Sequence, residues 1–169
     1  MGTPGYVPEV PLGFADAYRY VLEMDGIPTY PTLADGVSPV CPFEDPADNL
    51  AAQLVERGIH AAELIPNRNT TACVDAYVRA FTEAGIVVMG GTEHNTPDRI
   101  PIGVACADGP VSDYARQAFW EATCVVAAHQ HLLGRGEPGY VDATGARTGE
   151  DPAARRAELV ALGAALINA

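Results

Sequence analysis

Apolar and polar positions alternate along the chain with two different periods, which predict helices and strands in turn. The clearest helical period comes from four apolar residues spaced as neighbours on one helix face: Val74, Tyr77, Val78 and Phe81. Gly85 ends this helix, and the continuous apolar run 86–89 that follows is typical of a strand buried on both faces of a parallel sheet. These residues predict one helix–strand unit, and the alternation extends to both sides of it.

The flanking units are marked by capping residues and by further apolar runs. Strands are expected at 27–30, 59–65 and 86–89, and helices at 14–24, from the N-cap Asp45 to Gly58, through 74–81, from near Ser112 to about Leu133, and from Asp151 onwards. Strands separated by helices pair in parallel through right-handed crossovers, so their carboxyl ends share one edge of the sheet. We expect an α/β fold in which residues 1–13 form a flexible arm and residues 14–169 a single domain.

The small number of expected strands limits the architecture. A closed eight-stranded barrel takes about 250 residues, whereas this chain has 169. We therefore expect a half barrel, either a fragment or a chain completed by a partner. The loops that follow Tyr30, Ile65 and Met89 should converge at its rim.

Composition and net charge argue against several classes of protein and of binding partner. Hydrophobic residues make up 48% of the chain, as in globular domains, yet no apolar run approaches the roughly 18 residues of a membrane span. The N-terminus has neither a basic start nor an apolar leader, so we expect a cytoplasmic protein that does not bind membranes. The net charge of −12 repels phosphate backbones, so no nucleic-acid partner is expected either.

The residue types present also exclude several chemistries. All ten basic residues are arginine, and without lysine there is no Schiff base, no pyridoxal phosphate attachment and no Walker-loop lysine. The cysteines lack CxxC spacing, which argues against a zinc knuckle or a disulfide framework: Cys41, Cys73, Cys106 and Cys124. We interpret them as buried free thiols.

A candidate site follows the last predicted strand. Gly90 and Gly91 let the backbone turn tightly there, and Glu93, His94 and Asn95 come next. A carboxylate beside an imidazole can bind a divalent metal or share a proton, although a solvated turn has the same pattern. Adjacent residues in an extended segment point to opposite faces, so either Glu93 and Asn95 or His94 alone would face one cavity.

Glu63 adds to this site because it lies inside the apolar run 61–65 of the preceding strand. A buried carboxylate is costly unless it is paired or bound to a cation, and Arg68 is close enough in sequence to pair with it. The alternative is an edge-strand residue that faces water. Arg68 could instead hold a phosphate through its planar guanidinium. We expect Tyr30, Glu63 and Glu93 to meet at a common rim.

His129 and His131 have the spacing of a metal motif but lie in a predicted helix. Residues two apart on a helix diverge by about 200° and cannot share an ion. We interpret His129, on the apolar face, as a core histidine with its hydrogen bonds satisfied.

Three segments, in order along the chain, resemble motifs of the PHP (polymerase and histidinol phosphatase) superfamily. The family's Gly-Ile-Pro-Val strand followed by Gly-Ser-Asp-x-His is similar to residues 84–98, AGIVVMGGTEHNTPD. Its Gly-Gly-Ile-Pro-x-x-Ala-His-Pro strand resembles residues 25–36, DGIPTYPTLADG, and its Ile-Glu-Val-x-Asn strand resembles residues 61–67, AAELIPN. The resemblance implies parallel strand–helix units that form about half, the C-terminal half, of a distorted, TIM-like (βα)7 barrel.

The resemblance also implies a chemistry. In that family, metal ions at the strand ends activate water for phosphoester hydrolysis. Glu93 and His94 would then bind a divalent ion such as zinc, manganese or iron. Glu63 and His94 would carry the catalysis, with Glu63 as acid/base or beside the metal ligands.

The motifs depart from the family's pattern at several positions. The N-terminal His-x-His motif is absent, and Tyr30 and Asn95 stand where the family has histidines. Glu93 replaces an aspartate, and His94 lies one place early. The resemblance implies a small-molecule substrate that carries a phosphate group. This substrate would contact Tyr30, Arg68 and Asn95.

Three functions stay open. The first is a metal-dependent hydrolase of PHP type, here its C-terminal portion. The second is a degenerate, non-catalytic barrel that binds a small molecule or completes another chain, as a homo-oligomer or with a separate N-terminal half. The third is a sugar isomerase or epimerase barrel, which also gathers carboxylates and histidines at its strand ends and has support from the Glu63 strand alone.

Overall fold

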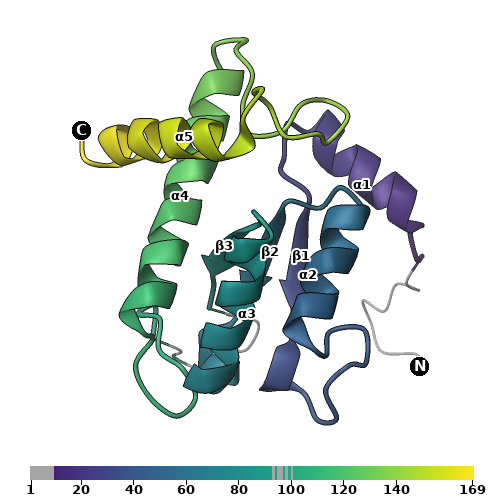
Figure 1. The fold of residues 1–169 in the computed structure, drawn as a ribbon, viewed down its shortest axis with the longest axis vertical. Helices are drawn as coiled ribbons and strands as arrows, with labels where there is room; N and C mark the ends of the chain where they lie inside the picture. Colours follow the sequence, from purple (N-terminus) through teal and green to yellow (C-terminus); the bar gives the residue numbers. More distant parts are fainter. Residues whose placement is uncertain (1–9, 93, 95–96, 98, 100) are drawn as a thin grey trace.

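Three short strands form a parallel sheet in the order β1-β2-β3, in a computed structural model that describes residues 10–92, 94, 97, 99 and 101–169 (Figure 1). The strands are β1 (Thr29–Thr32), β2 (Ala61–Leu64) and β3 (Val87–Gly90). The helices are α1 (Phe14–Glu23), α2 (Ala47–Glu56), α3 (Thr71–Glu83), α4 (Asp113–Leu133) and α5 (Pro152–Ile167), with short turns η1 (Ala34–Gly36) and η2 (Pro66–Arg68). The expected α/β class and parallel pairing are confirmed.

Helix α3 forms as its apolar spacing predicts. The four residues of the predicted face are all buried, and Thr70 caps the helix by accepting a hydrogen bond from the Cys73 N–H. Gly85 follows the end of the helix with φ +75°, a conformation that costs glycine little. The predicted end of this helix at Gly85 is therefore confirmed, whereas its cap, Thr70, was not predicted.

Helices α4 and α5 also begin where their capping residues predict. Ser112 Oγ accepts from the Ala115 N–H at 3.1 Å, and the Asp151 carboxylate accepts from the N–H groups of Ala153 and Ala154. The predicted cap of α2 is wrong, because Pro46 occupies the N-cap position with extended ψ and no side chain bonds to the first turn. Asp45 therefore lies one residue too early to cap it.

The strand and cysteine predictions need smaller corrections. β1 lies two residues later than the expected 27–30, because its pairing with β2 begins at Thr29 opposite Ala61. The free state of the cysteines is confirmed, but Cys41 is exposed and Cys73 half-buried, so only Cys106 and Cys124 match the predicted buried thiols.

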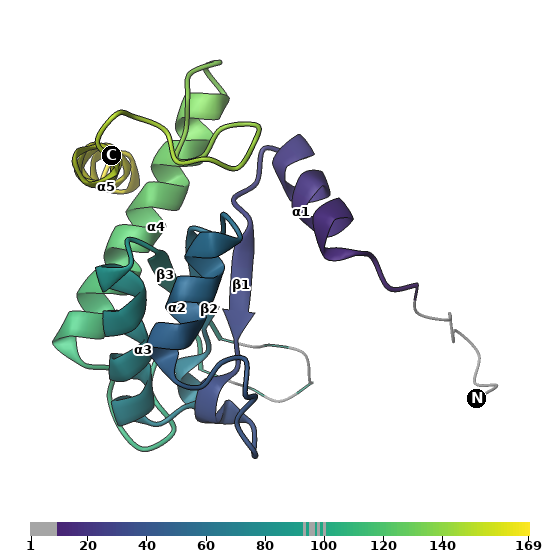
Figure 2. The same cartoon turned by 45° about the vertical axis from the view of Figure 1, so that its right-hand side comes forward.

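The two faces of the sheet pack against different helices. Ala62, Leu64 and Val88 point to one face and belong to the core beneath α2 and α3, which lie side by side over that face (Figure 2). Ala61 and Val87 point to the other face, where they belong to a second core with α4 and α5.

The second face is covered only where the strands begin. Ala61 and Val87 are fully buried there. Nearer the strand ends, on the same face, Pro31 is exposed while Glu63 and Met89 are half-buried. Within the part of the chain that the structure describes, this half of the second face is therefore open.

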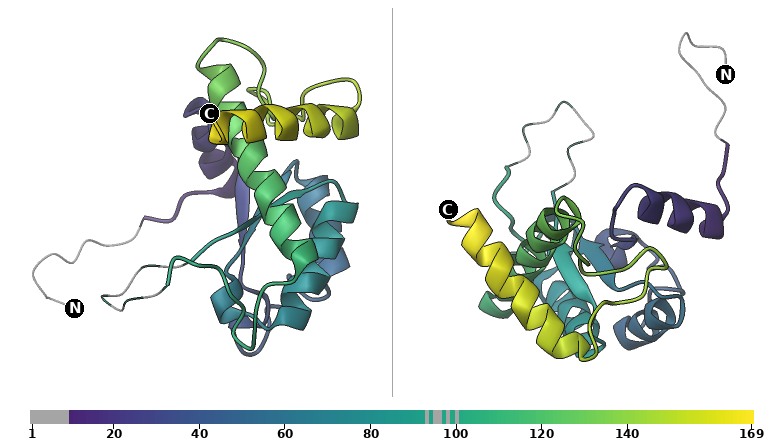
Figure 3. Two further views of the ribbon diagram at one scale, coloured as in Figure 1. Left: turned by 90° about the vertical axis from the view of Figure 1, so that its left-hand side faces the viewer. Right: turned by 90° about the horizontal axis from the view of Figure 1, so that it is seen from above.

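Helix α5 crosses α4 beyond the edge of the sheet where the strands begin (Figures 1 and 3). The crossing is close because Gly163 has no side chain: a Cβ there would overlap the carbonyl of Cys124. Leu159 is buried beside it. Among the described residues, no helix combines the length and the hydropathy that a bilayer span requires.

Candidate functional site

The carboxyl ends of the strands form the edge at which α/β proteins usually bind ligands. Glu63 lies near this edge, half-buried on the open half of the second face. Its carboxylate lies against Gly91, where any side chain would overlap Glu63 Oε1, and the Gly91 N–H donates to the Leu64 carbonyl at 2.8 Å. Gly91, the first residue after β3, therefore gives the Glu63 carboxylate the space it occupies.

His94 follows on the same strand end. Its side chain is exposed, and its Nδ1 lies 3.2 Å from the Thr92 carbonyl oxygen and 3.3 Å from Thr92 Oγ1. Glu93 and Asn95 lie outside the described residues, so the predicted Glu93–His94 metal pair stays a prediction.

Tyr30 does not lie with Glu63. In the parallel register Tyr30 aligns with Ala62, one residue before Glu63, so the two side chains point to opposite faces of the sheet. The Tyr30 hydroxyl donates to Glu44 Oε1 at 3.0 Å, and burial followed by the Glu44 charge raises the pKa of Tyr30 above its usual range. The expected common rim of Tyr30, Glu63 and Glu93 is wrong for Tyr30, which belongs to the helix-covered core.

Glu44 is the residue of this region that sequence reasoning missed. It is 2% exposed, and its carboxylate accepts from the Ala34 N–H at 2.6 Å, the Leu33 N–H at 3.1 Å and the Tyr30 hydroxyl. The Tyr77 hydroxyl donates to its backbone carbonyl at 2.7 Å. Glu44 therefore closes the loop after β1. Its surroundings in sequence, Phe43 and a Pro-containing turn, gave no periodic signal of burial.

Arg68, the predicted phosphate ligand, lies at the end of η2. It is exposed and packs against Gly36 in the loop after β1. The nearby N-terminus of α3 already holds carboxylates of the chain itself. Asp35 accepts from the Thr70 N–H at 3.1 Å and Asp108 from the Thr71 N–H at 2.7 Å, which holds the pKa of Asp108 below its usual range. A substrate phosphate at Arg68 would therefore bind without the help of this helix end.

The two histidines of α4 separate as the helical spacing predicts. His131 is exposed, whereas His129 is buried, and its Nδ1 accepts from the Tyr140 N–H at 2.9 Å. Since Nδ1 is an acceptor, the ring proton lies on Nε2, 3.1 Å from the Asp25 carbonyl oxygen to which it donates. His129 is a neutral core histidine with both nitrogens satisfied, as expected.

We expect this histidine to make stability depend on pH. Burial lowers the pKa of His129, against an opposing hydrogen bond to Asp25, so the unfolded chain binds more protons than the folded one below about pH 6.5. The stability that the neutral His129 contributes is full above that pH and is lost as the pH falls from there through the lower pKa of the folded state. Urea titrations between pH 7.5 and 5 should show a falling free energy of unfolding. The slope should flatten in His129→Leu and persist in His131→Gln.

Within the described ranges, no three histidine, cysteine, aspartate or glutamate side chains group closely enough to hold a metal ion. Searches against family models, curated proteins and solved structures found no match.

Proposed function

We propose that the chain is the C-terminal portion of a metal-dependent, phosphoesterase-like hydrolase of PHP type, built on half of a TIM-like barrel. The observation that carries the proposal is the position of Glu63: a half-buried carboxylate on the open half of the sheet face that α2 and α3 leave uncovered. In a barrel this face is the interior, and strand ends on it are where catalytic groups lie.

The residues at this edge fit a divalent ion in part. His94 offers an imidazole nitrogen, a ligand for zinc, manganese and iron, and Glu63 a carboxylate that would hydrogen-bond a ligand or a coordinated water. A zinc site needs about four ligands, so Glu93 and a further polypeptide segment would supply the rest. A bound ion would lower the pKa of a coordinated water and so supply the nucleophile.

The chain's own residues then have separate roles. Glu63 would accept or return the proton of the reaction, because its carboxylate lies on the open face beside the Gly91 backbone. Arg68, exposed at the same edge, would contact a substrate phosphate. Tyr30 is less suited to contact substrate, since its hydroxyl is bonded to Glu44.

A manganese titration tests the proposal. Mn²⁺ added to the purified chain and followed by calorimetry should bind, and Glu63→Gln should weaken binding by about tenfold or more. Glu56→Gln, which removes an exposed carboxylate at the end of α2, is the matched control and should bind as the parent does. Hydrolysis of bis(p-nitrophenyl) phosphate should rise with Mn²⁺ and fall in Glu63→Gln. Equal affinity in the two variants would contradict the role of Glu63.

A second candidate, a non-catalytic half barrel that completes a partner chain, is favoured by the edges of the sheet. Across the described residues β1 and β3 each pair on one side only, with β2 between them. Unpaired strand edges are templates for further pairing. Self-association in light scattering without Mn²⁺ binding would favour this candidate over the hydrolase, and a monomer without Mn²⁺ binding would contradict both.

A further inference from the structure

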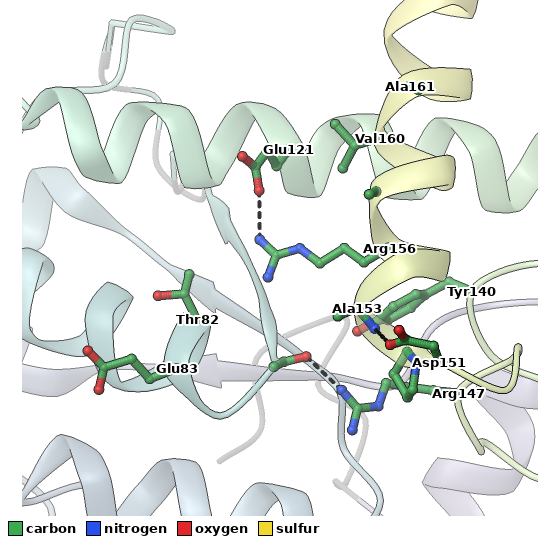
Figure 4. A pocket seen from close by; sticks show the side chains of 13 residues that line it. Thr82, Glu83, Glu121, Tyr140, Arg147, Asp151, Ala153, Arg156, Val160 and Ala161 are labelled. Carbon is green, nitrogen blue, oxygen red and sulfur yellow. Dashed lines mark hydrogen bonds and ion pairs between the residues drawn. The ribbon is translucent and has the colours of Figure 1, made fainter.

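A cavity of about 750 Å³ lies at the opposite edge of the sheet, where the strands begin (Figure 4). It is bounded by the end of α3, the middle of α4, the first turns of α5 and the loop before α5. Pockets for small molecules usually measure about 300–1,000 Å³. One wall is apolar and comes from α5: Pro152, Ala153, Ala157, Val160 and Ala161.

Arg147 lines the cavity from the loop before α5, and the position of its guanidinium depends on Gly85. Its Nη1 donates to the Gly85 carbonyl at 3.2 Å and lies 2.6 Å from the place that a Cβ of Gly85 would take. A side chain at Gly85 would therefore displace the guanidinium. The position of the positive charge depends on this glycine as well as on Arg147.

Arg147 differs from the other half-buried arginines. Arg155 and Arg156 pair with Glu158 and Glu121 at 3.1 and 2.8 Å. Arg147 has no carboxylate partner among the residues that the structure describes, and its Nη1 donates to a backbone carbonyl, that of Gly85. Its side chain is among those that line the cavity, beside the loop and first turn of α5 (Figure 4).

The carboxylates of the cavity wall are engaged elsewhere. Glu121 pairs with Arg156, and Asp151 caps α5 through the N–H groups of Ala153 and Ala154. Glu83 is exposed and points away from Arg147 (Figure 4). These three charges would repel a multiply charged anion such as phosphate more strongly than a singly charged one.

We propose that this cavity binds a small organic monocarboxylate, whose carboxylate meets the Arg147 guanidinium while its apolar body lies against the alanines and Val160 of α5. A guanidinium matches a carboxylate through two parallel hydrogen bonds, and burial of an apolar body adds affinity. The site lies at the edge opposite Glu63 and does not depend on the hydrolase proposal.

Benzoate is a suitable probe for the whole chain. Benzoate added in steps should shift the amide NMR signals of the residues that line the cavity. Arg147→Gln should weaken benzoate binding by about tenfold or more, because a charge-assisted pair is lost. Arg135→Gln, which removes an exposed arginine paired with Glu137 at 2.8 Å, should leave the affinity unchanged. Neutral benzamide, of the same shape, should bind about tenfold more weakly than benzoate.

A second variant tests the cavity without touching Arg147. Ala157 lies on the exposed first turns of α5, so Ala157→Phe should fill the space, abolish benzoate shifts and leave the melting temperature close to that of the parent. The proposal is overturned if benzoate causes no shifts in the cavity, if benzamide or inorganic phosphate binds as tightly, or if either variant binds benzoate like the parent.

Discussion

Replacement of Glu44 by alanine is expected to lower the free energy of unfolding by about 3–4 kcal/mol, since it leaves buried donors without an acceptor. The Leu33 and Ala34 N–H groups and the Tyr30 hydroxyl all donate to this carboxylate, which is 2% exposed. Water cannot replace the carboxylate without opening the loop after β1. Urea unfolding followed by circular dichroism measures the loss.

Three further variants separate this explanation from a general effect of losing a charge. Glu44→Gln keeps one acceptor oxygen and should lose about half as much stability. Tyr30→Phe removes one neutral donor and should cost about 1 kcal/mol. Glu56→Ala removes an exposed carboxylate and should stay within about 0.5 kcal/mol of the parent. A loss in Glu44→Ala no larger than that in Glu56→Ala would show that the bonds to Glu44 contribute little.

Replacement of Gly163 by alanine is expected to destabilise the contact of α5 with α4 by about 2–3 kcal/mol, although alanine is the better helix former. The added Cβ would overlap the Cys124 carbonyl, which belongs to the rigid backbone of α4. α5 must therefore move away, and Leu159 would lose its burial. Thermal unfolding measures the loss, and limited proteolysis should cut α5 before the rest of the chain.

The same substitution at Gly134 is the control. Gly134 follows α4 with helical φ of −60°, and a Cβ there would meet its nearest neighbours at 3.4 Å. Gly134→Ala should therefore leave stability unchanged or raise it by up to about 1 kcal/mol. An equal effect of the two substitutions would rule out the close crossing as the cause.

The helices could be predicted from the sequence because their signals are local. The face of α3 repeats over a few residues, and the caps Ser112 and Asp151 lie directly beside the helices they begin. Parallel pairing followed from the alternation of helices and strands, since each crossover must return the chain to the same edge. These features depend on residues close in sequence.

The positions of the site residues were predicted less well, because they depend on the register in which the strands pair. A shift of one residue moves a side chain to the other face of a sheet, and the Thr29–Thr32 strand has no alternation that would fix which side chains face inwards. Tyr30 was therefore placed with Glu63 although they face apart. Glu44 and Arg147 were missed for a related reason: their partners lie at least ten residues away, and neither stands in a periodic segment.

The two carboxylates at the start of α3 come from opposite sides of that helix in the sequence. Asp35 precedes Thr70 by 35 residues, and Asp108 follows Thr71 by 37. Each loop bonds to the first turn of α3, whose N–H groups have no acceptor within the helix itself. The first turn of α3 consequently links the loop after β1 to the loop before α4, two segments that lie far apart in the sequence.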